Sequence, residues 1–109
     1  MEFTFATLRL QKLCEQQKEA IRRLGPDSAG KLRKRLGDLM AATVVSDLAA
    51  GRPHPLSGDR AGEFAVDLAG GARLVFVAAV EPVPVSDSGA VDWGRVNKVN
   101  IVFVGDYHD

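Results

Sequence analysis

The run Glu63-Phe-Ala-Val-Asp-Leu68, followed closely by Ala72-Arg-Leu-Val-Phe76, decides the fold of this chain. In the first run large apolar side chains alternate with small or charged ones, the period of two residues that a half-buried β-strand shows. In the second, Leu74 and Phe76 point one way, and Arg73 and Val75 point the other. Gly70 and Gly71, between the runs, can supply the positive φ angles that a tight turn needs. The stretch therefore predicts an antiparallel β-hairpin.

Polar side chains gather around this hairpin. His54 and Arg60 lie in a loop that precedes it, and Arg73 begins its second strand. An imidazole and two guanidinium groups near one sheet are suited to binding phosphate. The same pattern is typical of a plain salt-bridged hairpin, and the residues alone leave both interpretations open.

The remaining elements are predicted from periodicity and caps. Residues 1–5 are expected to form a short edge strand. Thr7 can cap a helix that runs to about Leu24, where Gly25 and Pro26 end it, and a second helix follows to about residue 42. Residues 95–104 are expected to form the last strand, with the side chains on one face being Val99, Ile101 and Phe103. The order predicts an α+β fold in one domain, residues 1–109, with two N-terminal helices packed on a mainly antiparallel sheet of about four strands.

Charge and composition are those of a globular domain. The 109 residues carry no net charge, but residues 1–60 hold 11 Lys and Arg against 7 Asp and Glu, whereas residues 61–109 hold 3 against 7. The densest basic run, from Lys31 to Arg35, is expected to be a solvated helix face first and a contact to RNA phosphate second. Cys14, the single cysteine, lies on the apolar side of its predicted helix and is interpreted as a core residue.

Some classes of protein are disfavoured. The chain has no apolar run of about 20 residues and no leader-like start, so we expect a cytoplasmic protein. His54 and His108 lack the spacing of metal ligands, and no metal or cofactor is predicted. Trp93 is expected to pack on the edge of the sheet, with base stacking as the alternative.

Cleavage of RNA by its own 2′-hydroxyl is one reaction that needs no metal. It needs a base for that hydroxyl, cations for the charge that develops on phosphorus, and an acid for the leaving oxygen. If the last strand lies beside the hairpin, these parts could come from a scattered set comprising His54, Arg60, Arg73, Asp106, Tyr107 and His108.

The order and spacing of several motifs resemble one known family. The motifs are His54-x-Leu-x-Gly-Asp-Arg60-x-Gly-x-Phe64-x-Val-Asp-Leu68, Arg73-Leu-Val-Phe76, Asp92-Trp93 and Asp106-Tyr107-His108. Together they are similar to the RelE/ParE superfamily, and more narrowly to the HigB-like "killer" branch of toxins from bacterial type II toxin–antitoxin systems. The resemblance covers nearly the whole chain and is strongest over residues 51–109.

This resemblance implies a RelE-like fold and ribosome-dependent cleavage of mRNA, that is, an mRNA interferase that uses no metal. Arg73 would stabilise phosphate charge, Tyr107 and His108 would serve in acid–base work and base stacking, and Asp106 would orient them. His54 would lie near the scissile phosphate. The substrate backbone would be held by Arg60, with Lys31 and Arg35 as further phosphate contacts. The expected partners are the ribosome, mRNA and a helix-turn-helix antitoxin, and DNA would be met only through that antitoxin.

Two departures from the family pattern keep alternatives open. Related chains often carry Lys where this one has Ser57, and they are usually basic, whereas this chain is neutral. One alternative is a ParE-like toxin that inhibits gyrase by binding and has no enzymatic activity. The other is a weakened toxin that acts mainly through its antitoxin complex.

Overall fold

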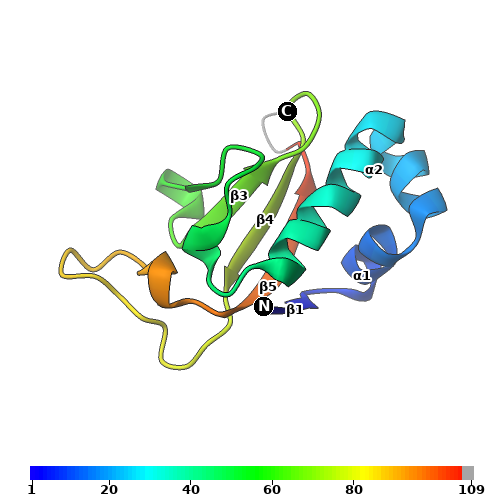
Figure 1. Cartoon of the computed structure of the whole chain (residues 1–109). Helices are drawn as coiled ribbons and strands as arrows, with labels where there is room; N and C mark the ends of the chain where they lie inside the picture. The colour runs from blue at the N-terminus through cyan, green and yellow to red at the C-terminus, as the bar shows by residue number, and fades with distance from the viewer. Residues whose placement is uncertain (107–109) are drawn as a thin grey trace.

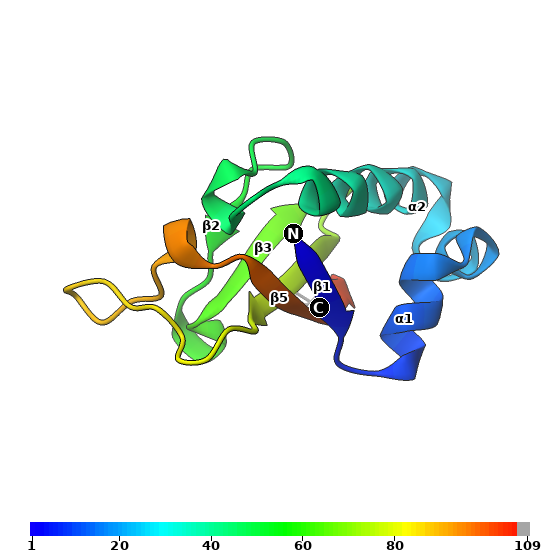
Figure 2. The same cartoon turned by 60° about the horizontal axis from the view of Figure 1, so that its bottom comes forward.

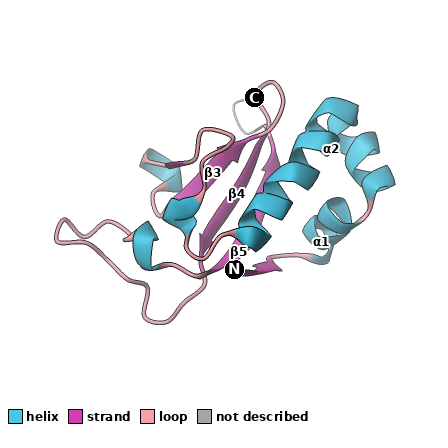
Figure 3. Cartoon of the chain, in the orientation of Figure 1, coloured by secondary structure: helices cyan, strands magenta, loops and turns pink. Residues whose placement is uncertain are grey.

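The computed structural model describes residues 1–106. Within them, helices cover one face of a five-stranded sheet whose order is β1-β5-β4-β3-β2 (Figures 1 and 3). The strands are β1 (Glu2–Phe5), β2 (His54–Pro55), β3 (Glu63–Asp67), β4 (Arg73–Ala78) and β5 (Lys98–Gly105). The helices are α1 (Leu8–Glu15) and α2 (Gln17–Ala41), with short 3₁₀ turns η1 (Val45–Asp47), η2 (Gly58–Arg60) and η3 (Trp93–Arg95). The predicted α+β class and the two helices on a sheet are confirmed.

The hairpin that decides the fold is present as predicted. β3 and β4 are antiparallel, and the register pairs Glu63 with Val77 at one end and Asp67 with Arg73 at the other. β5 lies antiparallel to β4 on its other side, and β1 adds to β5 in parallel as an edge strand. The predicted count of about four strands is one short, because His54 and Pro55, expected in a loop, pair with β3 as β2. The prolines at 53 and 55 had favoured an extended loop, and an extended chain beside an open strand edge pairs with it.

A β-bulge corrects the predicted faces of the last strand. The register pairs Val75 with Phe103 but Phe76 with Ile101, so one extra residue of β5 lies between the two pairs. Ile101 therefore lies on the helix-covered face, and Phe103 lies on the opposite one. The prediction that both faced the same way was wrong, because the alternation of a strand reverses where a bulge inserts a residue.

The helical layer breaks once more than expected. Thr7 caps α1 as predicted, with the Leu10 N–H donating to its Oγ1 at 3.1 Å. However, α1 stops at Gln16, whose φ of −113° and ψ of 110° are extended, so the helix predicted to reach Leu24 is two helical segments. The stop predicted at Gly25 is a kink inside α2, where φ is 84° and ψ is 164°. Figure 2 shows how these breaks fold α1 back beside α2.

The core lies between α2 and the covered face of the sheet. Leu32 and Leu39 of α2 are each 1% exposed, and they share this core with Leu74 and Phe76 of β4. Burying each such leucine contributes about 1.5–3 kcal/mol. Trp93 packs on Phe64 with ring centroids 4.9 Å apart, in agreement with the packing interpretation. No helix within residues 1–106 is long and apolar enough to cross a membrane.

Candidate functional site

The sheet face opposite the helices carries part of the predicted site. Its register aligns His54, Ala65, Val75 and Phe103 in one row across four strands. Asp67, Arg73 and Gly105 form the next row. We call this surface, with the loop residue Arg52 beside it, the open face, because the helices do not cover it; Ala65 and Val75 at its centre are nevertheless buried. The condition that the last strand lies beside the hairpin is therefore met, and Asp106 follows directly after the strand position paired with Arg73.

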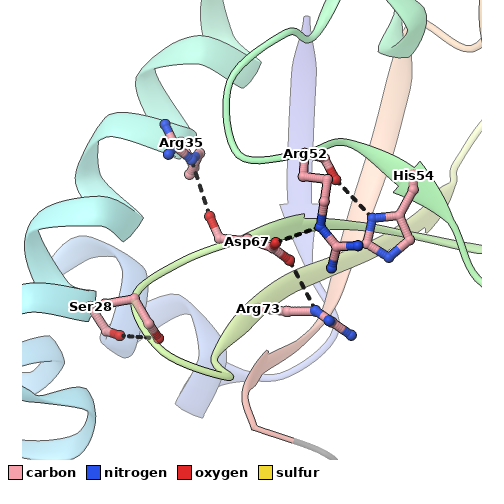
Figure 4. A network of polar contacts seen from close by, with 7 residues as sticks. Ser28, Arg35, Arg52, His54, Asp67 and Arg73 are labelled. Carbon is pink, nitrogen blue, oxygen red and sulfur yellow. Dashed lines mark hydrogen bonds and ion pairs between the residues drawn. The ribbon is translucent and has the colours of Figure 1, made fainter.

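Two arginines converge on one carboxylate at the end of the hairpin. The Nε of Arg73 donates to Oδ1 of Asp67 at 2.9 Å, and the Nε of Arg52 donates to Oδ2 at 2.9 Å (Figure 4). Burial by itself raises the pKa of Asp67, but the hydrogen bonds from Arg52 and Arg73 outweigh it, so the pKa is lowered overall. Asp67 is therefore an ionised anchor that orients both guanidinium groups.

The loop that carries Arg52 has an unusual backbone. Gly51 and Arg52 both have positive φ angles, 83° and 48°. A Cβ at position 51 would lie 2.5 Å from Nε of Arg35 and 3.1 Å from the carbonyl oxygen of Asp67, so only glycine fits there. The N–H of Asp67 in turn donates to the carbonyl of Gly51 at 2.6 Å. The loop is thus fastened to the end of β3 by backbone as well as side-chain contacts.

Arg35 also holds the end of β3 in place. Its Nε donates to the carbonyl oxygen of Asp67 at 3.1 Å, and its side chain is only 12% exposed (Figure 4). Arg35 therefore ties α2 to the end of the hairpin. Lys31, one turn earlier, is exposed on α2, away from the open face. The predicted phosphate contacts of Lys31 and Arg35 stay predictions.

The imidazole of His54 has a defined hydrogen-bonding partner. Its Nδ1 lies 2.7 Å from the carbonyl oxygen of Arg52 (Figure 4). A carbonyl only accepts, so Nδ1 carries the proton and, in the neutral ring, Nε2 carries the lone pair. This is the state in which a histidine can take a proton at Nε2.

Arg60 lies across the open face. It comes from η2, its guanidinium carbon is 4.9 Å from the centroid of the Phe103 ring, and its Nη1 contacts Oε1 of Glu63 at 2.6 Å. A cation held over an aromatic face and paired with a carboxylate is well fixed. Ser57, which stands where related chains often have Lys, is exposed immediately before η2.

The C-terminal part of the predicted site is described only at its start. Asp106 is exposed, and its carboxylate lies against the turn at Gly71, where an added Cβ would be 2.5 Å from Oδ2. Tyr107 and His108 lie outside the described residues. Among residues 1–106 no group of three or more His, Cys, Asp or Glu side chains could hold a metal ion.

The structure therefore brings His54, Arg60 and Arg73 to one face, as the site prediction required. It adds Arg52 and Asp67, which the sequence analysis did not propose. The alternation of β3 already put Asp67 on the outward face, but pairing with residue 52 depends on a turn that no local pattern shows. Chemically, the open face offers a basic imidazole nitrogen together with cations that suit an anionic, phosphate-bearing substrate.

The fold can now be compared with solved structures. It is shared with YoeB/ParE toxins, and a RelE-like fold is what the resemblance predicted. Among solved structures, a YoeB/ParE toxin from Agrobacterium tumefaciens is similar to this chain with a TM-score of 0.59 and 17% identity, over 99% of this chain and 100% of that one. A YoeB–YefM complex and a YoeB dimer from Staphylococcus aureus each give a TM-score of 0.56 and 16% identity, over 100% of this chain and 98% of theirs.

Sequence comparison adds no closer relation. No protein-family model matches the chain, and a search of curated proteins finds no match. At 16–17% identity the structural likeness concerns the fold. The narrower HigB-like assignment stays a prediction.

Proposed function

We propose that this chain is the toxin of a type II toxin–antitoxin module and acts as an mRNA interferase on the translating ribosome. One observation carries the proposal. On a fold shared with YoeB/ParE toxins, His54 and Arg73 occupy one open sheet face, and hydrogen bonds fix the orientation of both side chains. A fixed imidazole beside fixed guanidinium groups supplies a proton acceptor and charge stabilisation for phosphodiester cleavage.

The proposed reaction is attack by the 2′-hydroxyl of the substrate on the adjacent phosphorus. His54 Nε2 accepts the hydroxyl proton while the bond from O2′ to phosphorus forms and the bond from phosphorus to O5′ breaks. Arg73 stabilises the negative charge on the phosphoryl oxygens, and Arg60 holds the backbone. A proton from Tyr107 or His108, oriented by Asp106, reaches the leaving O5′. The products are a 2′,3′-cyclic phosphate and a 5′-hydroxyl. The proposed step uses no metal or cofactor.

The proposed partners are a helix-turn-helix antitoxin, the ribosome and its mRNA, all in the cytoplasm. One of the similar solved structures is a complex between YoeB and YefM, which supports an antitoxin partner for this chain. The ribosome and mRNA follow from the proposed activity.

A weakened toxin is the second candidate, and a specific observation favours it. Carboxylates pair with three arginines of the open face: Asp67 with Arg52 and Arg73, and Glu63 with Arg60. These acids offset cations that would otherwise attract RNA. Combined with a net charge of zero and Ser57, they reduce the pull of this face on a polyanion.

Induced expression in a host without the antitoxin separates the candidates. The interferase is expected to arrest growth, and Arg73→Ala combined with Tyr107→Phe is expected to abolish the arrest. A gyrase-inhibiting binder would arrest growth with or without Tyr107 and His108, so truncation after Asp106 would leave its toxicity intact. A weakened toxin would not arrest growth at all, although it would still bind the antitoxin in a pull-down.

A further inference from the structure

Among residues 1–106, Arg52 is the one residue other than glycine whose φ is positive, at 48°. Side chains with a Cβ rarely adopt this conformation, because the Cβ then crowds the carbonyl oxygen. Arg52 also precedes Pro53, which restricts its backbone further. Backbone strain of this kind persists only where surrounding contacts impose it, and it gathers at functional sites.

Arg52 is also held by a side-chain pair with Asp67. The Arg52 side chain is 65% exposed, yet its Nε is held 2.9 Å from Oδ2 of Asp67. Asp67 is itself fixed by the ladder to Arg73, by the carbonyl of Gly51 and by Arg35. The strained residue is therefore tied to a rigid point at the end of β3.

The backbone conformation of Arg52 affects the hydrogen bond of His54. The carbonyl oxygen of Arg52 accepts the Nδ1 proton of His54 at 2.7 Å. If residue 52 relaxed to a negative φ, its carbonyl would point elsewhere and Nδ1 would lose its acceptor. The ring has no other hydrogen bond within the described part of the chain. Pairing of His54 with Ala65 holds the backbone in place, so the carbonyl of residue 52 is what chooses the tautomer.

We infer that Arg52 is a positioning residue: its pair with Asp67 holds residue 52 in the left-handed conformation, and the carbonyl oxygen of that residue fixes the proton of His54 on Nδ1. Nε2 is thereby kept unprotonated, so that it can accept a proton from a substrate. Arg52 thus acts on His54 through its backbone carbonyl. We call the two successive contacts, Asp67 to Arg52 and Arg52 to His54, the relay. The role of this relay in RNA cleavage rests on the proposed function, whereas the tautomer itself does not.

The test reads the tautomer directly. Protein labelled with ¹⁵N histidine is examined by long-range ¹H–¹⁵N correlation at about pH 8.5, where imidazoles are neutral. His108→Gln identifies the signals of His54. The wild type is expected to show protonated Nδ1 and unprotonated Nε2 for His54. Arg52→Ala is expected to shift His54 toward the Nε2–H tautomer, which free histidine prefers in water, and Asp67→Asn is expected to do so to a smaller extent.

Arg52→Gly is the discriminating variant. Glycine adopts a φ of 48° without strain, so the carbonyl can stay in place although the side chain is gone. Arg52→Gly is therefore expected to keep more of the Nδ1–H tautomer than Arg52→Ala. Glu19→Gln, which removes the carboxylate that pairs with Arg22 on α2, is the matched control and is expected to leave His54 unchanged.

Either of two results would overturn the inference: wild-type His54 with its proton on Nε2, or an Arg52→Ala spectrum identical to wild type. Cleavage assays on ribosomes add the functional readout. Arg52→Ala is expected to lower kcat at least tenfold with little change in KM, and Arg52→Gly to restore part of the loss. If neither the wild type nor any variant cleaves mRNA but the tautomers follow the expected order, the inference about Arg52 stands and the proposed activity fails.

Discussion

Arg73 and Asp67 are directly opposite in the register of β3 and β4, and Nε of Arg73 donates to Oδ1 of Asp67 at 2.9 Å. Neighbouring strands place the two side chains on the same face, so the pair follows from the hairpin itself. The Arg73 side chain is only 16% exposed, and a paired, mostly buried guanidinium has few orientations open to it. The residue proposed to stabilise phosphate charge is thus positioned before any substrate binds.

Removing Arg73 tests its proposed role. Arg73→Ala is expected to lower the rate of ribosome-dependent mRNA cleavage by about 10²–10³-fold, the usual loss when one charge-stabilising donor is removed. Arg95→Ala is the matched control, because Arg95 also pairs with an aspartate through Nε, at 2.8 Å to Asp92, but lies in η3. Cleavage by folded Arg73→Ala at the wild-type rate would remove Arg73 from the mechanism.

Asp67 is expected to make stability depend on pH. Its pKa is lowered in the folded protein, so its contribution is complete above the ordinary value of 3.8 and is lost as the pH falls through the lower folded value. At neutral pH, Asp67→Asn is expected to lower the free energy of unfolding by about 1–2 kcal/mol, since it weakens two charge-assisted bonds at a partly exposed site.

Urea denaturation of both proteins at a series of pH values checks this expectation. The difference between wild type and Asp67→Asn should narrow as the pH falls below 3.8. A difference that stays constant down to the acid limit would show that the arginine pairs of Asp67 do not stabilise the fold.

Arg35 and Lys31 are expected to behave differently although both belong to the basic run of α2. Arg35→Ala removes the bond to the Asp67 carbonyl from a side chain that is 12% exposed, and should cost about 1–3 kcal/mol of unfolding free energy. Lys31→Ala alters an exposed position and should stay within about 0.5 kcal/mol of wild type. Thermal denaturation followed by circular dichroism compares them, and equal melting temperatures would contradict the structural role of Arg35.

Cys14 is expected to react slowly. Burial, and to a lesser extent the nearby charge of Glu15, raises the pKa of the Cys14 thiol to about 12. At about pH 8 roughly one thiol in ten thousand is then ionised, against roughly a quarter of unperturbed thiols. Alkylation by iodoacetamide in the native protein should therefore be at least about a hundredfold slower than in urea. Equal rates in both states would show that Cys14 is not packed against the core.

The sequence predicted most of the architecture because its signals were local. The alternation in β3 and β4, the cap at Thr7 and the stop at Gly25 each depend on neighbouring residues, and each has its counterpart in the structure. The bulge in β5 could not be predicted, because the apolar residues at 101–104 suit either face. The break at Gln16 left no local signal, since no glycine or proline marks it.

The grouping of the candidate site residues could be predicted in part for the same reason, and their roles stay predictions. Motifs fixed the positions of His54, Arg60 and Arg73, and strand pairing then brought them to one face. Arg52 was missed, because its role arises from a positive φ and from a partner 15 residues away. Such a pair becomes visible only once β3 and the loop before β2 have been placed together.

The central claim, that the open face cleaves mRNA, is tested most directly by mapping transcripts in cells. The wild type and the double variant Arg73→Ala/Tyr107→Phe are induced in a host without the antitoxin, and primer extension locates the 5′ ends of cellular mRNAs. The proposal predicts new ends within reading frames for the wild type and none for the double variant. Growth arrest without new ends, unchanged in the double variant, would contradict it and favour a toxin that acts by binding alone.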